Sequence, residues 1–370
     1  MRRTLTTALL AAQLALAAAC AGPAAAPAPS APAPPAAPAA TAQAPAAQAP
    51  AATTAPAAAA APTTPPQRQS IRYGYVPIVA SAAMYIANER GYFTEQGIDL
   101  EMLSFDSGAL MPPALSAGQL EAGHGTPGPA LFNALARSID IKTIASISYN
   151  GTQLMVRKDL ADQIHSVADL KGKRMSFMVE GSPIDLTMRR VLYQNGLTLQ
   201  DVDVQRLSMP DSAAALANGG LDAAAVVEPF PVLIETRGVG SRPLDVQGMV
   251  WKDEASIILA GPSLLSRSDA AVTAFLVGFL KGMRDFHAAQ RDDKLVDPAV
   301  TEIISRWTNI PVDILTKATD SGAPPNNRID LDDLNRQQDF WAQEGLVQTK
   351  ADLSSFVEYK YLDAAVPQVR

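Results

Sequence analysis

Residues 180–185, with the sequence EGSPID, combine a carboxylate with the signals of a helix start. Ser182 can cap the helix, Pro183 suits its first turn, and Asp185 is an acid three residues after the cap. The free N–H groups of a helix start can donate hydrogen bonds to a polar ligand atom, and Glu180 adds an acceptor beside them. This combination predicts contact with a ligand that both donates and accepts hydrogen bonds. The alternative is that Glu180 faces solvent and only favours the helix start electrostatically.

Other places where strands are expected to end and helices to begin carry residues of the same kinds. The polar candidates for ligand contact are Asp106, Ser107, Thr126, Asn150, Glu180, Ser182 and Glu228. The aromatic candidates, which could stack on a ring, are Tyr75, Tyr85, Tyr149 and Phe230. The candidates include acids but no lysine or arginine. This asymmetry favours a ligand with ring N–H donors over an anion, although helix starts alone can hold an anion.

Motifs for catalysis, a metal or a cofactor are weak in this chain. GHGTPG at 123–128 matches the dinucleotide pattern G-x-G-x-x-G, but the strand before it is short and no acid follows at the next strand tip for a ribose hydroxyl. His124, His165 and His287 have no partner at metal-ligand spacing. The nucleophile motif G-x-S-x-G does not occur. We therefore expect no catalytic residue, cofactor or metal; contact with a ligand stays open for His124 because of its turn.

Apolar strand-like runs alternate with amphipathic helical runs between residues 71 and 236. The expected strands are 71–76, 98–103, 141–148, 174–179, 202–207 and 223–227. The expected helices are 82–90, 109–117, 127–136, 183–195, 212–218 and 229–236. This alternation predicts an α/β fold with a mainly parallel sheet, in which ligands bind outside the carboxyl ends of the strands. Beyond residue 261 the pattern turns helical, with helices expected at 268–290, 298–307 and 331–344.

The first seventy residues have the composition of an export signal and a tether. Arg2 and Arg3 precede the apolar run 5–19, which ends just before Cys20 and is too short to span a membrane comfortably. We expect residues 1–20 to be a lipoprotein signal peptide with Cys20 as the lipidated residue; a plain signal cut near residue 19 is the alternative. Residues 21–70 are rich in alanine and proline and contain no aromatic residue, which predicts a disordered tether.

The charge and cysteine content limit the partners and the chemistry. The formal net charge of -7 provides no basic surface for nucleic acid. Cys20 is the only cysteine, so the part after the tether has no disulfide and no cysteine nucleophile. The remaining chain of about 300 residues is long enough for two lobes with separate cores. We expect small molecules or proteins as partners.

Several short motifs, in this order and spacing, resemble those of one family of binding proteins. They are GYF at 91–93, GIDLE at 97–101, ALSAGQLEAG at 114–123, DLKGK at 169–173, ALANGGLDA at 215–223 and EP at 228–229. Between about residues 71 and 240, the chain resembles the periplasmic substrate-binding proteins that serve sulfonate, taurine, nitrate and thiamine-precursor ABC transporters.

The resemblance implies a periplasmic-binding-protein fold with two α/β lobes, two crossover segments and a ligand cleft between the lobes. We expect lobe 1 at 71–155 and 256–370, lobe 2 at 156–255, and crossovers near 151–156 and 251–257. Together with the signal before Cys20, it leads us to expect a monomer that is exported, anchored to the membrane through lipid, faces the periplasm or the cell exterior, and delivers a ligand to a permease. The family resembles in fold an enzyme that makes the thiamine pyrimidine, but that enzyme's cysteine-rich segment is missing here.

The acids and aromatic residues of the turns suggest the ligand class. A carboxylate opposite a helix start suits the edge of an aminopyrimidine or a flavin, and aromatic side chains would stack on the rings. We expect riboflavin first and the thiamine pyrimidine precursor second. The alternatives are a sulfonate-, taurine- or nitrate-binding protein of the same fold, an enzyme like the thiamine pyrimidine synthase, and a ligand-sensing domain that docks to a receptor.

Overall fold

The computed structural model describes residues 68–250 and 252–369. The predicted signal peptide with Cys20, the predicted tether up to residue 67, and Trp251 lie outside these residues. Strand β1 (Gln69–Tyr75) already includes Gln69 and Ser70, which we expected in the tether. None of the helices in the described part of the chain combines the length and the apolar character that crossing a membrane requires.

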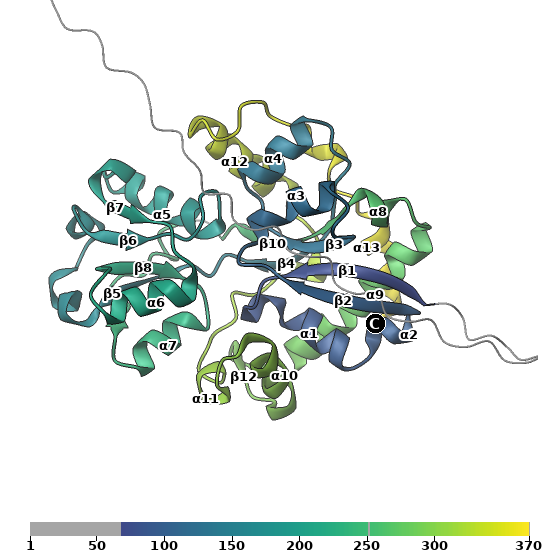
Figure 1. Cartoon of the computed structure of the whole chain (residues 1–370), viewed down its shortest axis with the longest axis horizontal. Helices are drawn as coiled ribbons and strands as arrows, with labels where there is room; N and C mark the ends of the chain where they lie inside the picture. Colours follow the sequence, from purple (N-terminus) through teal and green to yellow (C-terminus); the bar gives the residue numbers. More distant parts are fainter. Residues whose placement is uncertain (1–67, 251, 370) are drawn as a thin grey trace, which may run out of the picture. The chain divides into compact units, whose positions relative to one another are not determined.

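The first of two large sheets has five strands in the order β2-β1-β3-β10-β4. Its strands are β1, β2 (Ile98–Ser104), β3 (Ala122–Gly125), β10 (Glu254–Ala260) and β4 (Lys142–Tyr149). β1 pairs in parallel with β2 and β3, whereas β10 pairs antiparallel with β3 and β4. We call this sheet and the helices packed on it lobe 1 (Figure 1).

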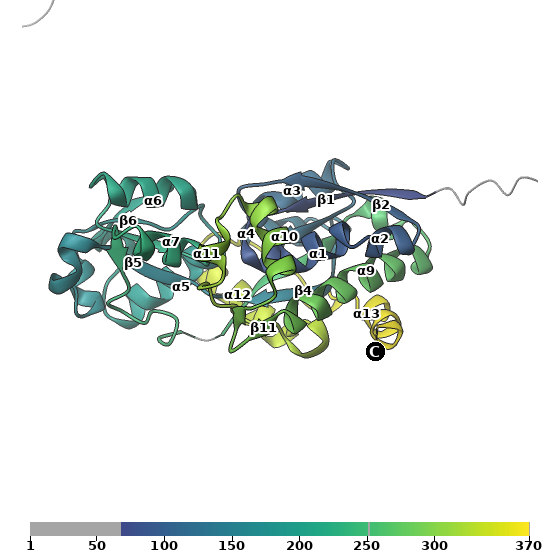
Figure 2. The same cartoon turned by 90° about the horizontal axis from the view of Figure 1, so that it is seen from below.

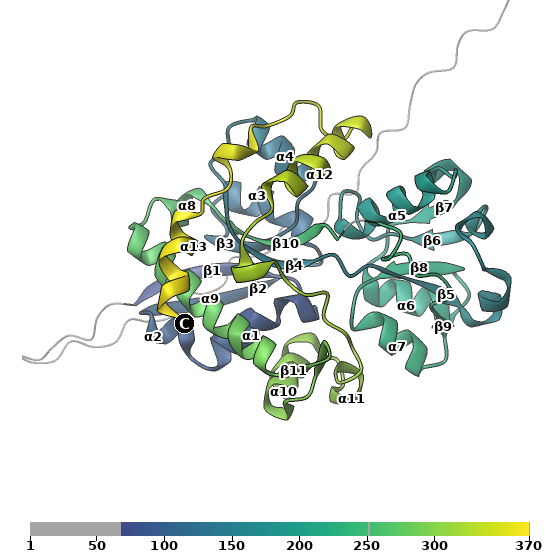
Figure 3. The ribbon, with the colours of Figure 1, turned by 180° about the vertical axis from the view of Figure 1, so that it is seen from behind.

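Helices cover both faces of the first sheet. On one face, α9 packs against α1, α2 and α13, as Figures 2 and 3 show. These helices are α1 (Ala82–Glu89), α2 (Tyr92–Glu95), α9 (Asp269–Ala288) and α13 (Lys360–Ala365). The backbones of α1 and α9 approach closely, because a Cβ added at Gly282 would lie 2.1 Å from the carbonyl oxygen of Ala83. The other face carries α3 (Met111–Ser116), α4 (Pro129–Ala136) and α12 (Leu331–Gln343) (Figure 1).

The second sheet also has five strands, in the order β7-β6-β8-β5-β9. Its strands are β5 (Gln153–Arg157), β6 (Arg174–Ser176), β7 (Asp203–Gln205), β8 (Ala223–Val226) and β9 (Gly240–Ser241). Its helices are α5 (Pro183–Gln194), α6 (Met209–Ala217) and α7 (Phe230–Thr236). We call this sheet and its helices lobe 2.

Several short elements also follow β10, besides α9, α12 and α13. They are α8 (Pro262–Leu265), the hairpin of β11 (Gln290–Arg291) and β12 (Lys294–Leu295), α10 (Pro298–Thr308) and α11 (Val312–Leu315). The long helix expected at 268–290 is confirmed as α9, and the helix expected at 331–344 is confirmed as α12.

The sheets are mixed, which corrects the prediction of a mainly parallel sheet. Each lobe contains one antiparallel strand that follows a crossover: β5 pairs antiparallel with β8 and β9, and β10 pairs antiparallel with β3 and β4. Neither strand was expected, because both were interpreted as crossover segments. β10 is buried along its whole length, so its sequence EASIILA lacks the alternation of apolar and polar residues that marks a half-buried strand.

The chain crosses between the two sheets twice. The first crossing joins the end of β4 at Tyr149 to the start of β5 at Gln153, and the second joins β9 to the start of β10 at Glu254. The sheet boundary therefore differs by a few residues from the expected lobe boundaries at 155 and 256. The two-lobed fold with two crossovers is nevertheless the predicted one.

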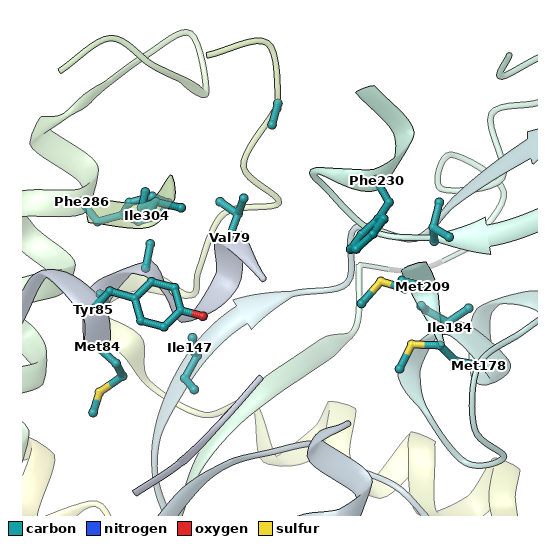
Figure 4. Packing of buried hydrophobic residues seen from close by; sticks show 14 of the residues in the cluster. Val79, Met84, Tyr85, Ile147, Met178, Ile184, Met209, Phe230, Phe286 and Ile304 are labelled. Atoms are coloured by element: carbon teal, nitrogen blue, oxygen red, sulfur yellow. The ribbon is translucent and has the colours of Figure 1, made fainter. Parts of the chain in front are cut away.

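Apolar side chains from both lobes pack close to the place where the two sheets end. Figure 4 shows Val79, Tyr85 and Ile147 from lobe 1 on one side and Met178, Met209 and Phe230 from lobe 2 on the other. All of these side chains are buried. The polar groups described next therefore lie in largely apolar surroundings.

Candidate ligand-binding site

A cavity with walls from both lobes lies at the ends of the two sheets. It contains about 860 Å³ of empty space, part of which is open to solvent. Lobe 1 contributes Val76, Val79, Ser107, His124, Thr126 and Ser148, and lobe 2 contributes Met178, Ser182, Ile184, Met209, Val227 and Glu228. A segment between α11 and α12 adds Thr319, Asp320 and Ser321. Among the described residues, the lining contains no lysine or arginine, and its acids are Glu228 and Asp320.

The structure divides the predicted site residues into two groups. Those that line the cavity are Ser107, Thr126, Tyr149, Asn150, Ser182 and Glu228. Those that do not line it are Tyr75, Tyr85, Asp106, Glu180 and Phe230. The first group shares one location, the ends of strands of both sheets, as expected for turns at the carboxyl edges.

Glu180 points away from the cavity, although its neighbour Ser182 lines it. The Glu180 side chain is 56% exposed, and its Oε1 atom lies 2.9 Å from Nη2 of Arg189. The acid that the helix start holds is Asp185, which is fully buried and accepts from the Gly181 N–H at 3.0 Å, from Arg189 at 3.0 Å and from Arg206 at 2.7 Å. The turn itself has no lysine or arginine, but two cations reach it from elsewhere: Arg189 from one helical turn further along α5 and Arg206 from the residue after β7.

The aromatic candidates lie mainly in the cores of the lobes. Tyr85 is fully buried, donates its hydroxyl to the carbonyl of Val76 at 2.9 Å and stacks on Trp307 with 5.3 Å between ring centres. Tyr75 contacts the same two rings edge to face, and Phe230 is buried at the start of α7. Large apolar rings near strand ends and first helical turns fit the space between helix and sheet, which explains their burial. Asp106 is exposed.

Tyr149 and Asn150 lie at the first crossing and belong to the cavity wall. Lys252 places its Nζ atom 4.6 Å from the centre of the Tyr149 ring. The side-chain oxygen of Asn150 accepts from the N–H of Thr152 at 3.0 Å and from its hydroxyl at 2.7 Å, while the side-chain amide donates to Thr187. The polar atoms of Asn150 therefore hold the first crossing against α5. Tyr149 contributes the surface of its ring to the cavity wall.

Ser182 and Thr126 differ in how their hydroxyl groups are used. The Ser182 hydroxyl accepts from the N–H of Asp185 at 3.2 Å, which is the predicted helix cap. The Thr126 hydroxyl is buried, and none of the described residues forms a hydrogen bond with it. Thr126 therefore has an unused donor and acceptor on the cavity wall.

Glu228 is the acid with the most unusual surroundings in the cavity. Burial is the main cause that raises its pKa to about 7, against the opposing effect of Arg242, whose Nη1 atom lies 3.5 Å from Oε1. The Oε2 atom is buried and makes no hydrogen bond of ordinary length and angle within the described part of the chain. Near neutral pH the side chain can therefore present either an acceptor or a carboxyl O–H to a ligand.

Several cavity residues were not among the sequence-based candidates. Ser148 and Ser256 could have been found from the ends of β4 and β10, had β10 been recognised. Thr319, Asp320 and Ser321 lie in a loop far along the chain, where the sequence carries no signal for a ligand. His124, for which the sequence leaves contact with a ligand undecided, lines the cavity. Its Nδ1 atom lies 2.8 Å from the hydroxyl of Ser81.

Comparison with known proteins identifies the family. Residues 64–272 match the model of the NMT1-like family. A protein of Brucella abortus (strain 2308), named as a binding protein without a stated ligand, is 26% identical over 228 residues, which cover 61% of this chain and 69% of that protein. The riboflavin-binding protein RibY of Chloroflexus aurantiacus is 25% identical over 220 residues, covering 59% of this chain and 62% of RibY.

Solved structures share the fold at low sequence identity. The alkanesulfonate-binding protein SsuA from Xanthomonas axonopodis pv. citri, bound to MOPS, has a TM-score of 0.63 and 19% identity, and the match covers 79% of this chain and 99% of SsuA. The desulfurization enzyme DSZB has a TM-score of 0.60 and 17% identity, and the match covers 82% of this chain and 100% of the enzyme. These comparisons confirm the family that the sequence motifs predicted. The chain belongs to the NMT1-like family and has the two-lobed fold of periplasmic substrate-binding proteins.

Proposed function

We propose that this protein is the solute-binding component of an ABC-type importer and that it captures an uncharged heteroaromatic ligand. The proposal is supported by the names of its relatives, which are binding proteins, and by a cavity built from both lobes. Closure of two lobes on a ligand is a common hinge motion in proteins of this fold. In this role the protein binds and releases its ligand without making or breaking a bond.

The observation that carries the ligand class is the charge of the cavity wall. Among the described residues, the lining has no lysine or arginine, and it includes the partly protonated Glu228 and the neutral His124. Such a wall offers hydrogen-bond donors and acceptors but no lysine or arginine side chain that could pair directly with an anion. A neutral ring with N–H and carbonyl or ring-nitrogen groups suits it better than an anion does.

The placement of the aromatic residues removes the reason for ranking riboflavin above the thiamine pyrimidine precursor. Riboflavin was expected first because several aromatic side chains were thought to surround the ligand, but of these only Tyr149 lines the cavity in the described residues. Stacking therefore no longer favours a three-ring flavin over a single pyrimidine ring. We propose the class of heteroaromatic compounds and use riboflavin and an aminopyrimidine as its two test ligands.

An anion such as a sulfonate is the second candidate. The structural similarity to SsuA favours it, and the start of α5 at Ser182 could donate N–H groups to an oxyanion. The buried Glu228 opposes it, because bringing an anion close to a carboxylate favours protonation of the acid and costs binding energy.

An enzymatic role has weaker support, although DSZB shows that the fold can also occur in an enzyme. Ser81 and His124 form a serine–histidine pair, but Ser81 is not among the residues that line the cavity, and its hydroxyl also contacts the carbonyl oxygen of Val76. The folded part contains no cysteine. Binding without turnover is therefore the proposal.

We also propose that the mature protein is exported and held at the membrane by a lipid on Cys20. The support is the apolar run that ends at Cys20 and the alanine- and proline-rich residues that follow. A ligand-sensing domain would share the binding behaviour, so capture of a permease or of a receptor distinguishes the two roles.

A calorimetric and thermal-shift panel of riboflavin, an aminopyrimidine, taurine and nitrate tests the ligand class. We expect a stoichiometric heat of binding and a rise in melting temperature with one of the two ring compounds, because a ligand that binds only the folded state stabilises it. Binding of taurine or nitrate with no response to either ring compound would contradict the proposal. Release of a chemically changed product would instead support an enzyme.

A further inference from the structure

We infer that Nε2 of His124 is a fixed hydrogen-bond acceptor on the cavity wall, so that the ligand must present an N–H or O–H donor to it. The inference rests on the proposed function, because it concerns the ligand of the same cavity. It deepens that proposal by naming one residue that sets specificity and one chemical group that the ligand needs.

The first observation is that the Ser81 hydroxyl has a single proton to donate and lies close to a carbonyl oxygen and to an imidazole nitrogen. Its Oγ atom lies 2.7 Å from the carbonyl oxygen of Val76 and 2.8 Å from Nδ1 of His124. The carbonyl can only accept, so two oxygens at 2.7 Å need the Ser81 proton between them. Ser81 Oγ must then accept the second hydrogen bond, and the proton of that bond belongs to Nδ1 of His124.

The Val76 carbonyl holds this arrangement in place. It accepts from the N–H of Ile78 at 2.8 Å and from the hydroxyl of Tyr85 at 2.9 Å, in addition to Ser81. The Tyr85 hydroxyl also lies 3.3 Å from the carbonyl oxygen of Ile78, but its contact with Val76 is the shorter one, and together these donors hold the Val76 carbonyl toward Ser81. Tyr85, which does not reach the cavity, is therefore a positioning residue for the serine that orients His124.

The second observation is that the His124 ring is neutral. The ring is almost completely buried, and burial lowers its pKa to about 4. A neutral imidazole carries one proton, and Ser81 places that proton on Nδ1. Nε2 is then a bare acceptor, since the ring's hydrogen bond to Ser81 is made through Nδ1.

The third observation is the set of unused polar atoms that face the same space. Thr126 directly follows the end of β3 and lines the same cavity as His124, and its buried hydroxyl has no partner among the described residues. On lobe 2, Oε2 of Glu228 is also buried and makes no hydrogen bond of ordinary length and angle within the described residues, although the backbone N–H groups of Val232 and Thr319 act on this carboxyl. An amino group or ring N–H opposite His124 would satisfy Nε2, whereas nitrate, which has no proton, would bring lone pairs against it.

The tautomer can be measured without any ligand. Long-range proton–nitrogen correlation spectra of the ¹⁵N-labelled full chain distinguish the two nitrogens of each histidine, and the signals that disappear in His124→Gln belong to this residue. We expect a proton on Nδ1 and none on Nε2, and a mixture of tautomers in Ser81→Ala but not in Ser81→Thr. A proton on Nε2 in the unaltered protein would overturn the inference.

The donor requirement is tested with a matched pair of probes, 4-aminopyrimidine and 4-dimethylaminopyrimidine. By calorimetry we expect the amino compound to bind roughly tenfold or more tightly, and His124→Leu to remove most of that difference. The exposed His165 supplies the control His165→Leu, which should leave both affinities unchanged. Equal affinity for the two probes, or tight binding of nitrate, would contradict the inference. If neither ring compound binds, the proposed ligand class fails, and the tautomer measurement decides the inference by itself.

Discussion

Oε1 of Glu228 lies 3.5 Å from Nη1 of Arg242, while a shorter contact of 2.5 Å joins Arg242 to Glu235. Arg242 therefore divides its charge between two acids and compensates the buried one only in part. This division, together with burial, explains why the pKa of Glu228 rises to about 7 despite a nearby guanidinium.

The raised pKa of Glu228 predicts a pH-dependent effect of Glu228→Gln on stability. The folded state holds the Glu228 proton more tightly than the unfolded chain does, so the ionised side chain lowers stability as the pH rises from about 4.5 to about 7. The glutamine variant, which cannot ionise, should gain stability relative to the unaltered protein between pH 5 and pH 8, by at most roughly 3 kcal/mol. Urea unfolding of both proteins at several pH values measures this difference.

A matched control is Glu302→Gln, because Glu302 is exposed and far along the chain in α10. Measured at the same pH values, this variant gives the effect of replacing an exposed carboxyl by an amide. Asp253 and Glu254 also have pKa values that burial raises to about 7. Both residues are present in all three proteins, so their effects on stability cancel when the two variants are compared. A flat difference for Glu228→Gln would show that this carboxyl is not held protonated in the folded state.

Asp185 should be important for the stability of lobe 2 rather than for ligand contact. Asp185→Asn keeps the size of the side chain but leaves the nearly buried Arg189 and the partly exposed Arg206 without their shared carboxylate. Breaking a buried ion pair by removing one partner costs about 3–5 kcal/mol of unfolding free energy, and because Arg189 keeps Glu180 and Glu344 as partners, we expect the lower end of that range. Chemical denaturation should show a loss near that size, whereas Asp203→Asn, at an exposed position of the same lobe, should cost little.

Ligand binding should change the distance between the two lobes. Gln119 follows α3 in lobe 1, Gln200 lies before β7 in lobe 2, and both side chains are exposed. With Cys20 replaced by serine, cysteines at these two positions can carry spin labels, because the chain then has no other thiol. We expect a narrower distance distribution on saturation with ligand. Identical distributions with and without ligand would indicate a rigid cavity.

Cys20→Ser should release the protein from the membrane without changing its ligand affinity. Cys20 lies outside the described residues, and the expectation rests on the lipoprotein-like signal that precedes it. Membrane fractionation of cells that produce each protein, followed by calorimetry of the purified samples, measures both properties. Persistence of the serine variant in the membrane fraction would argue against a lipid anchor on this residue.

The sequence alone determined the family, the two-lobed α/β fold and most elements between residues 71 and 236. The family and the two lobes follow from the resemblance of the short motifs to known binding proteins. The elements depend on local signals: the apolar runs of β1, β2, β4, β6 and β8, the proline and serine that open α5, and the glycines that follow helices. The cap at Ser182 is one example, since its partner Asp185 is only three residues away. Such contacts need no knowledge of the rest of the chain.

Only the tertiary structure decided which polar groups face the cavity. Glu180 and Glu228 look alike in the sequence, each just ahead of a helix, yet one pairs with Arg189 at the surface and the other is buried on the cavity wall. The difference comes from where distant side chains fall once the lobes fold. The same holds for His124, whose acceptor atom depends on Ser81 and on the Val76 carbonyl, and for Thr319–Ser321, which reach the cavity from a loop that follows α11. Hydrogen-bond partners and burial are properties of three-dimensional neighbours, so residue type and spacing could not assign them.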